Sequence, residues 1–176
     1  MRWPIVFLLA ASGAWAQTGS GAAPANPLVT SSKVFYMNAK QDILRSADKM
    51  PEAKYAFRPT DSVRSYGQIL AHVADGQYEF CGAAAGNHDH KGVEETAKTK
   101  ADIVAALKTA FAYCDAIYAH MTDAQAQEMI LAFGGIKITR LSMLDFNVSH
   151  TMEHYGNLVT YMRMEGLVPP SSESRQ

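Results

Sequence analysis

Apolar residues recur at spacings of three and four along four stretches of this chain, which is the pattern of helices that each bury one face. The last stretch predicts a helix over 139–166, with Thr139 as its N-cap and Gly166, followed by two prolines, as its stop. Its expected buried stripe consists of Leu141, Leu144, Val148, Thr151, Tyr155, Leu158 and Met162.

Three earlier helices are expected over 30–49, 62–85 and 99–121. The first is expected to begin at Thr30 or Ser31 and to end before Pro51. Its stripe is expected to contain Val34, Met37, Leu44 and Ala47. The second stripe consists of Ile69, Val73, Gly76, Phe80 and Ala83, and the third of Ile103, Leu107, Ala110, Cys114, Ile117 and Met121.

The segments between these helices differ in length and composition. Residues 50–61 contain two prolines, and residues 123–137 contain the turn signal Gly134-Gly135, with 133–138 as a candidate short extended piece. The polar connection over 86–98 is long enough to carry the chain from one end of a bundle to the other. Because no segment alternates with period two and no internal repeat occurs, the sequence predicts an all-α four-helix bundle.

The N-terminus has the pattern of a secretory signal peptide. Met1 and Arg2 precede an apolar run over 3–11, and Ala14-Trp15-Ala16 has the small-x-small form of a cleavage site. The apolar run is too short to span a bilayer comfortably, so no membrane attachment is expected after cleavage. We therefore expect a signal peptide over 1–16, a flexible linker over 17–27, the bundle over 28–172 and a disordered tail over 173–176. The protein is expected to be exported, either periplasmic or secreted.

Composition narrows the function classes. The 176 residues carry a formal net charge of −1, and only 19% are charged, so no basic surface for nucleic acid is indicated. The two cysteines, Cys81 and Cys114, leave two alternatives open. They form one disulfide in an oxidising compartment, or they are two buried thiols that behave as small apolar residues.

Three of the six histidines are candidates for a metal site. His150 and His154 are four residues apart, so their rings project from one helix face one turn apart. His72 lies beside the apolar stripe of the 62–85 helix, where it could supply the third ligand. Three neutral imidazoles would leave a position open for water or substrate, as in catalytic sites. Nitrogen-only ligation favours Zn²⁺, Ni²⁺ or Cu²⁺ over Mg²⁺ or Ca²⁺.

The other histidines are expected to be ordinary. His120 lies near a helix end, and His88 and His90 lie in the polar connection, where solvated side chains are favoured over a second metal site. Asp75 lies one turn from His72 and is placed to orient its ring. Glu153 is expected to point to a different flank from the histidine pair.

Asn157 and Tyr161 follow the histidine pair on the last helix. Both are expected to pack or to hydrogen-bond within the bundle rather than to line a pocket.

Two segments resemble the motifs of a known family. RPTDSVRSYGQILAHVAD, over 58–75, resembles the second-helix motif of the DinB/YfiT-like superfamily, and HTMEHYGNLVTYMRMEGLVPP, over 150–170, resembles its closing motif. The similarity extends from about residue 27 to residue 172. The resemblance implies that His72, His150 and His154 are ligands of a divalent metal ion, with Zn or Ni favoured. It also implies an up-down-down-up bundle and a homodimer.

The family's functions are diverse. Characterised relatives include thiol-dependent transferases and isomerases, and many others are described as metal-dependent hydrolases. Export counts against a thiol cofactor, so we expect hydrolysis of a small, unidentified substrate, with catalytic residues unassigned. The alternatives are a metal-dependent thiol transferase, a non-enzymatic exported metal-binding or stress-associated bundle, and a bundle without metal whose histidines only pack.

The helix order that the resemblance implies also bears on the cysteines. The helices over 62–85 and 99–121 would run parallel, which would put Cys81 and Cys114 at similar heights and make a disulfide geometrically feasible.

Overall fold

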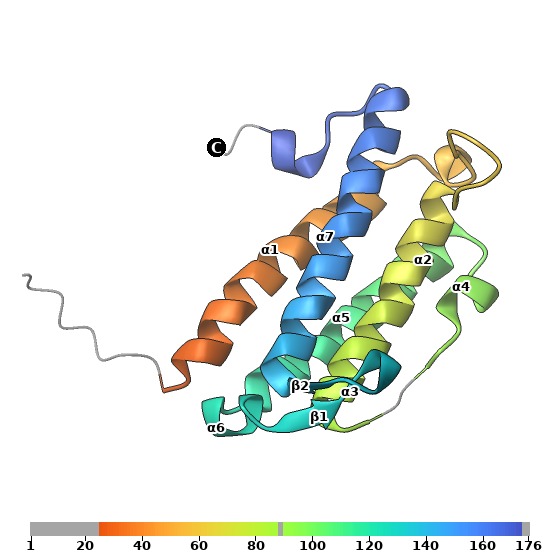
Figure 1. The fold of residues 1–176 in the computed structure, drawn as a ribbon. Coiled ribbons are helices and arrows are strands. Elements are labelled where there is room, and N and C mark those ends of the chain that lie inside the picture. Colours follow the sequence, from red (N-terminus) through yellow and green to blue (C-terminus); the bar gives the residue numbers. More distant parts are fainter. Residues whose placement is uncertain (1–24, 88–89, 174–176) are drawn as a thin grey trace, which may run out of the picture.

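Four long helices lie side by side in the computed structural model, which describes residues 25–87 and 90–173 (Figure 1). They are α1 (Pro27–Lys49), α2 (Tyr66–Gly76), α5 (Lys100–His120) and α7 (Arg140–Met164). α2 continues through a π-helical segment, η2 (Gln77–Cys81), into α3 (Gly82–Ala85). The all-α bundle predicted from the sequence is confirmed.

Shorter elements occupy the connections. They are η1 (Glu52–Lys54), α4 (Val93–Thr96), α6 (Asp123–Ala126), β1 (Met129–Leu131), η3 (Phe133–Gly135), β2 (Lys137–Thr139) and η4 (Pro170–Ser172). The two strands pair antiparallel in the segment where the sequence indicated a turn and a short extended piece.

Contacts between helix ends set the direction of each helix. The start of α1 lies by the end of α5, because the Leu28 and Val29 amides donate to Asp123. The start of α2 lies by the end of α1, where the Tyr66 hydroxyl donates to the Ser46 carbonyl. The start of α7 lies by the end of α3, where Arg140 donates to the Ala84 carbonyl. α1 and α7 therefore run in one direction and α2 and α5 in the other, an up-down-down-up order (Figure 1).

The predicted start of α1 is wrong. The helix begins at Pro27 rather than at Thr30 or Ser31, because proline is favoured in the first turn and the Asp123 carboxylate accepts two of the first free amides. A cap that is 95 residues away in the chain leaves no local sign in the sequence.

The predicted stripe of α1 is also wrong at two positions. Val34 and Met37 are exposed. The buried face instead contains both apolar and polar residues, which are Val29, Ser32, Tyr36, Ala39, Ile43, Ser46 and Ala47. Ser32 can be buried because its hydroxyl donates to Asp145 at 2.6 Å.

The second helix begins four residues later than expected. The helix begins at Tyr66, and Ser65 caps it in a capping box with Gln68. The amides of Tyr66 and Gly67 donate to the carbonyls of Phe57 and Tyr55, which fixes the loop that precedes the helix.

Cys81 and Cys114 form a disulfide whose Cα atoms lie 5.5 Å apart, so the alternative of two buried thiols is wrong. The bond joins η2 to α5. It lies inside a core of fully buried side chains that includes Tyr36, Tyr66, Phe111, Leu70, Leu107 and Leu158.

Several expectations concern residues outside the described ranges. They include the signal peptide over 1–16, residues 17–24 of the linker, residues 174–176 of the tail, and His88. Among the helices that the structure describes, none has the length and apolar character that crossing a membrane requires.

Candidate metal centre

His72, His150 and His154 meet where α2 packs against α7. The Nε2 atom of His150 lies 3.2 Å from Nε2 of His72 and 3.1 Å from Nε2 of His154. One nitrogen of each ring lies within 4.8 Å of the others, and all three side chains are half-buried. The structure thus brings together the three histidines selected from the sequence.

Gly76 allows the His150 ring to lie close against α2. A Cβ atom at this position would lie 2.8 Å from Cε1 of His150. Phe80, one turn later, meets the same imidazole edge to face, with ring centroids 4.9 Å apart. A glycine inside a helix lowers stability by about 1 kcal/mol relative to alanine. The close approach of His150 explains why a glycine nevertheless occupies this position.

A buried polar network fixes η2 against α7 beside His150. The Gln77 amide donates to Thr151 at 3.0 Å, and the Asn147 amide donates to Gln77 at 2.8 Å. Asn147 and Thr151 lie three residues before and one residue after His150, so the network sets the position of that turn of α7. Gln77 is fully buried and lies in the π-helical segment η2. Short π-helical segments often occur at functional sites.

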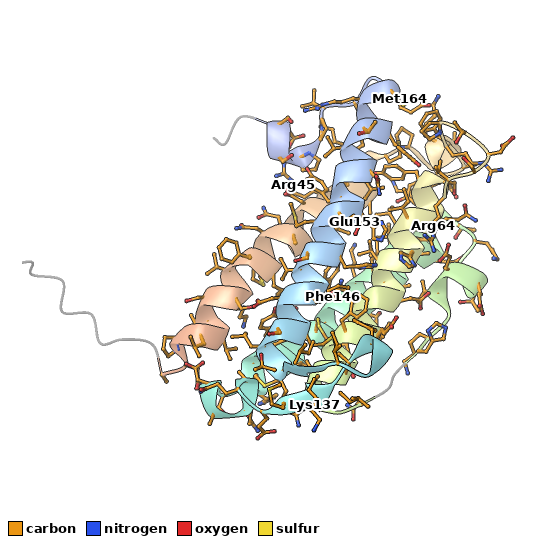
Figure 2. The ribbon with its side chains drawn as sticks, viewed as in Figure 1. Arg45, Arg64, Lys137, Phe146, Glu153 and Met164 are labelled. Atoms are coloured by element: carbon orange, nitrogen blue, oxygen red, sulfur yellow. A yellow bond between two sulfur atoms is a disulfide. The ribbon has the colours of Figure 1, made fainter. Side chains whose placement is uncertain are left out.

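Glu94 is the carboxylate that contacts the cluster. Its Oε2 lies 3.3 Å from Nδ1 of His72, and its Oε1 accepts from Nε of Arg64 at 2.8 Å. A carboxylate on Nδ1 fixes the proton there and turns the Nε2 lone pair toward the other two histidines. Figure 2 shows Arg64 near the start of α2, on the side where α4 lies.

Asp75 does not orient His72 directly, so that prediction is wrong. Its carboxylate instead accepts from the Val93 and Glu94 amides, at 2.8 and 2.9 Å, and caps the short helix α4. The capped helix carries Glu94 to His72. Sequence reasoning missed Glu94 because nothing in the polar connection shows that its backbone is tied to Asp75.

The environment keeps the His150 and His154 imidazoles neutral. Burial, followed by the neighbouring His154 and His72, lowers the pKa of His150 to about 4, and burial also lowers the pKa of His154. The Nδ1 atoms of both rings are buried and have no hydrogen-bond partner among the described residues. Three imidazoles with converging Nε2 atoms are the donor set that Zn²⁺ and Ni²⁺ favour, so the residues fit a divalent ion.

A cavity of about 400 Å³ adjoins His72 and His150. Its other lining residues include Glu79, Phe80 and Glu95. A small molecule could therefore reach the histidine cluster from this side.

The remaining candidates lie as follows. His120 is exposed at the end of α5, His90 is exposed on the rim of the cavity, and Glu153 is exposed on α7, where Figure 2 labels it. Asn157 is exposed, whereas the buried Tyr161 donates its hydroxyl to the Arg64 carbonyl. These two side chains do not line the cavity described above.

Comparison with known proteins gives consistent results. The model of the DinB superfamily matches residues 36–158. YjoA of Bacillus subtilis, an uncharacterised protein, is 24% identical over 123 residues, which are 68% of this chain and 79% of YjoA.

Solved structures with the same fold include two DinB-like proteins. One, from Bacillus cereus, matches with a TM-score of 0.70 at 14% identity, covering 80% of this chain and 95% of that protein. YjoA matches with a TM-score of 0.67, covering 86% of this chain and all of YjoA. A mycothiol-dependent maleylpyruvate isomerase matches with a TM-score of 0.61 at 12% identity, covering 74% of this chain and 60% of the isomerase.

Proposed function

This chain belongs to the DinB superfamily, and from that premise we propose that it is an exported, divalent-metal-dependent enzyme that hydrolyses a small substrate. His72, His150 and His154 would hold the ion, with zinc or nickel favoured. The observation that carries the proposal is the convergence of three imidazoles beside a cavity that reaches two of them.

A divalent ion at such a site supplies Lewis-acid activation of water or of a substrate carbonyl. The protein's own groups hold the ligands in position for it. Glu94, paired with Arg64, keeps the Nδ1 proton on His72, and Gly76 and Phe80 pack on the His150 ring. Phe80 also excludes water from part of that ring, which strengthens electrostatic interactions nearby.

Proton transfer in this proposal falls to a carboxylate of the cavity wall. Asp75 is occupied with the amides of α4, and Glu94 with Arg64 and His72. Glu79 and Glu95 line the same cavity and have no ion-pair partner within the described part of the chain. They are therefore the carboxylates available to accept a proton.

Two observations support an accessible hydrolytic site over the alternatives. The buried disulfide suits an oxidising compartment, and with the expected export it weighs against a small thiol cofactor. The cavity beside the histidines favours an accessible site over the closed coordination of a structural ion.

Metal-dependent hydrolysis tests the proposal. The mature protein would be stripped with a chelator, reloaded with Zn²⁺ or Ni²⁺, and assayed on a panel of p-nitrophenyl esters and anilides. We expect turnover that requires the ion, is lost in His150→Ala and persists in His120→Ala, whose imidazole lies on the surface of α5. Equal rates for the stripped and reloaded protein, or full activity in His150→Ala, would contradict the proposal.

A further inference from the structure

A second cavity continues from the histidine cavity toward the β1–β2 hairpin. Both cavities are lined by Glu79 and His90, so they meet at these side chains. The second has a volume of about 530 Å³, and its walls include Leu131, Phe133 and Met143. We call the part formed by these three side chains the apolar trough.

Aromatic rings connect the trough to the histidines. The Phe80 ring lies edge to face against His150 at 4.9 Å and against Phe133 at 5.8 Å, between ring centroids. Phe146 contacts both phenylalanines, at 5.0 and 5.2 Å. Figure 2 shows Phe146 on α7 just above the hairpin. A continuous apolar wall therefore leads from a candidate ligand imidazole to the hairpin.

The hairpin presents Leu131 and Phe133 to the second cavity. Ile130 and Ile138 form a cross-strand pair that packs on the core, so Leu131 lies on the other face and is 66% exposed. Gly134 and Gly135, both with positive φ, make the turn that follows Phe133, which is 46% exposed. Apolar side chains gathered in the open beside a polar site are typical of ligand-binding surfaces.

We propose that the apolar trough binds the apolar arm of the substrate while the substrate's polar group reaches the three histidines. This inference rests on the proposed function and defines its substrate class. The described lining residues of both cavities include no lysine or arginine, and Glu79 lies where the cavities meet. The substrate is therefore a small molecule whose aromatic or branched aliphatic arm carries no negative charge.

Two neutral metal ligands that differ only in the arm test this inference. Imidazole and 4-phenylimidazole would be titrated into the protein loaded with Co²⁺, with binding followed by the change in the visible absorption of the ion. Covering on the order of 60 Å² of the phenyl ring, at ~25 cal/mol per Å², corresponds to about tenfold tighter binding. We expect Phe133→Ala and Leu131→Ser each to reduce this advantage several-fold and to leave the Kd of imidazole unchanged.

Ile136→Ala is the matched control, because Ile136 is an exposed apolar residue of the same hairpin that does not line the trough. It should preserve the full advantage of 4-phenylimidazole. A carboxylate on the phenyl ring should weaken binding relative to 4-phenylimidazole.

The possible outcomes distinguish a failure of the apolar trough from a failure of the proposed metal site. Equal Kd values for the two probes in the wild type, or an advantage that survives both trough substitutions, would overturn the trough and leave the metal site intact. Tighter binding of the carboxylate probe would overturn the charge assignment. A protein that takes up no Co²⁺ would overturn the metal site, and with it the inference.

Discussion

Breaking the Cys81–Cys114 disulfide should destabilise the protein by an amount that follows from the loop it closes. The two residues are 33 positions apart. The chain-entropy relation for a loop of that length gives about 4 kcal/mol at 25 °C. For a folded domain of about 150 residues, each kcal/mol shifts Tm by about 2–4 °C, so we expect a fall of about 8–15 °C.

Thermal unfolding with and without reductant measures this effect. A Cys81→Ala, Cys114→Ala double variant should melt at least as low as the reduced wild type, because both sulfur atoms are fully buried and their removal leaves unfilled space. The double variant is also the control, since reductant should leave its Tm unchanged.

Two results would refute the reasoning. One is a wild-type Tm that falls by less than about 2 °C once thiol titration shows that the disulfide is fully reduced, because the loop entropy would then be absent. The other is the titration of two free thiols per chain under denaturing, non-reducing conditions, because the bond itself would then be absent.

Three further predictions concern the histidine cluster. Gly76→Ala should displace His150 and weaken metal binding while circular dichroism shows that the fold is retained. Gly156→Ala is the control and should bind metal normally, because its new Cβ would have no neighbour within 4 Å. Glu94→Gln should raise the Kd for zinc by about 10–100-fold in a competition assay with a chromophoric chelator, and an unchanged Kd would remove Glu94 from the site. Acid should destabilise the metal-free protein, because the pKa of His150 is about 4 in the folded state and 6.5 ordinarily. Below about pH 6.5 the unfolded chain binds a proton that the folded chain does not. The free energy of unfolding therefore falls as the pH drops from 6.5 toward 4. Chemical denaturation at pH 7.5 and 5 checks this, and His150→Ala should show a shallower dependence.

Local signals in the sequence were sufficient for two of the helices. α5 follows a capping box between Thr99 and Asp102, and α7 is capped by Thr139 and ends before Gly166, so neighbouring residues define their boundaries. α1 could not be bounded in this way, because its first amides are capped by Asp123 from another part of the chain.

In the candidate site, too, the sequence predicted the features that depend on neighbouring residues and missed those that depend on distant ones. His150 and His154 were found from their spacing within one helix, and His72 from its place beside an apolar stripe. Glu94 and the close approach of His150 to Gly76 depend on contacts between segments that are distant in sequence. The apolar trough could not be predicted from the sequence either. The hairpin strands have only three residues each, too few for an alternating pattern to be recognised.

The central claim is that three histidines from two helices hold one divalent ion. Elemental analysis of the purified mature protein, beside His72→Ala, His154→Ala and the surface control His120→Ala, tests it most directly. We predict about one ion per chain in the wild type and in His120→Ala, and none in the other two variants. A wild-type protein that is isolated without metal and stays empty after Zn²⁺ or Ni²⁺ is added would contradict the account.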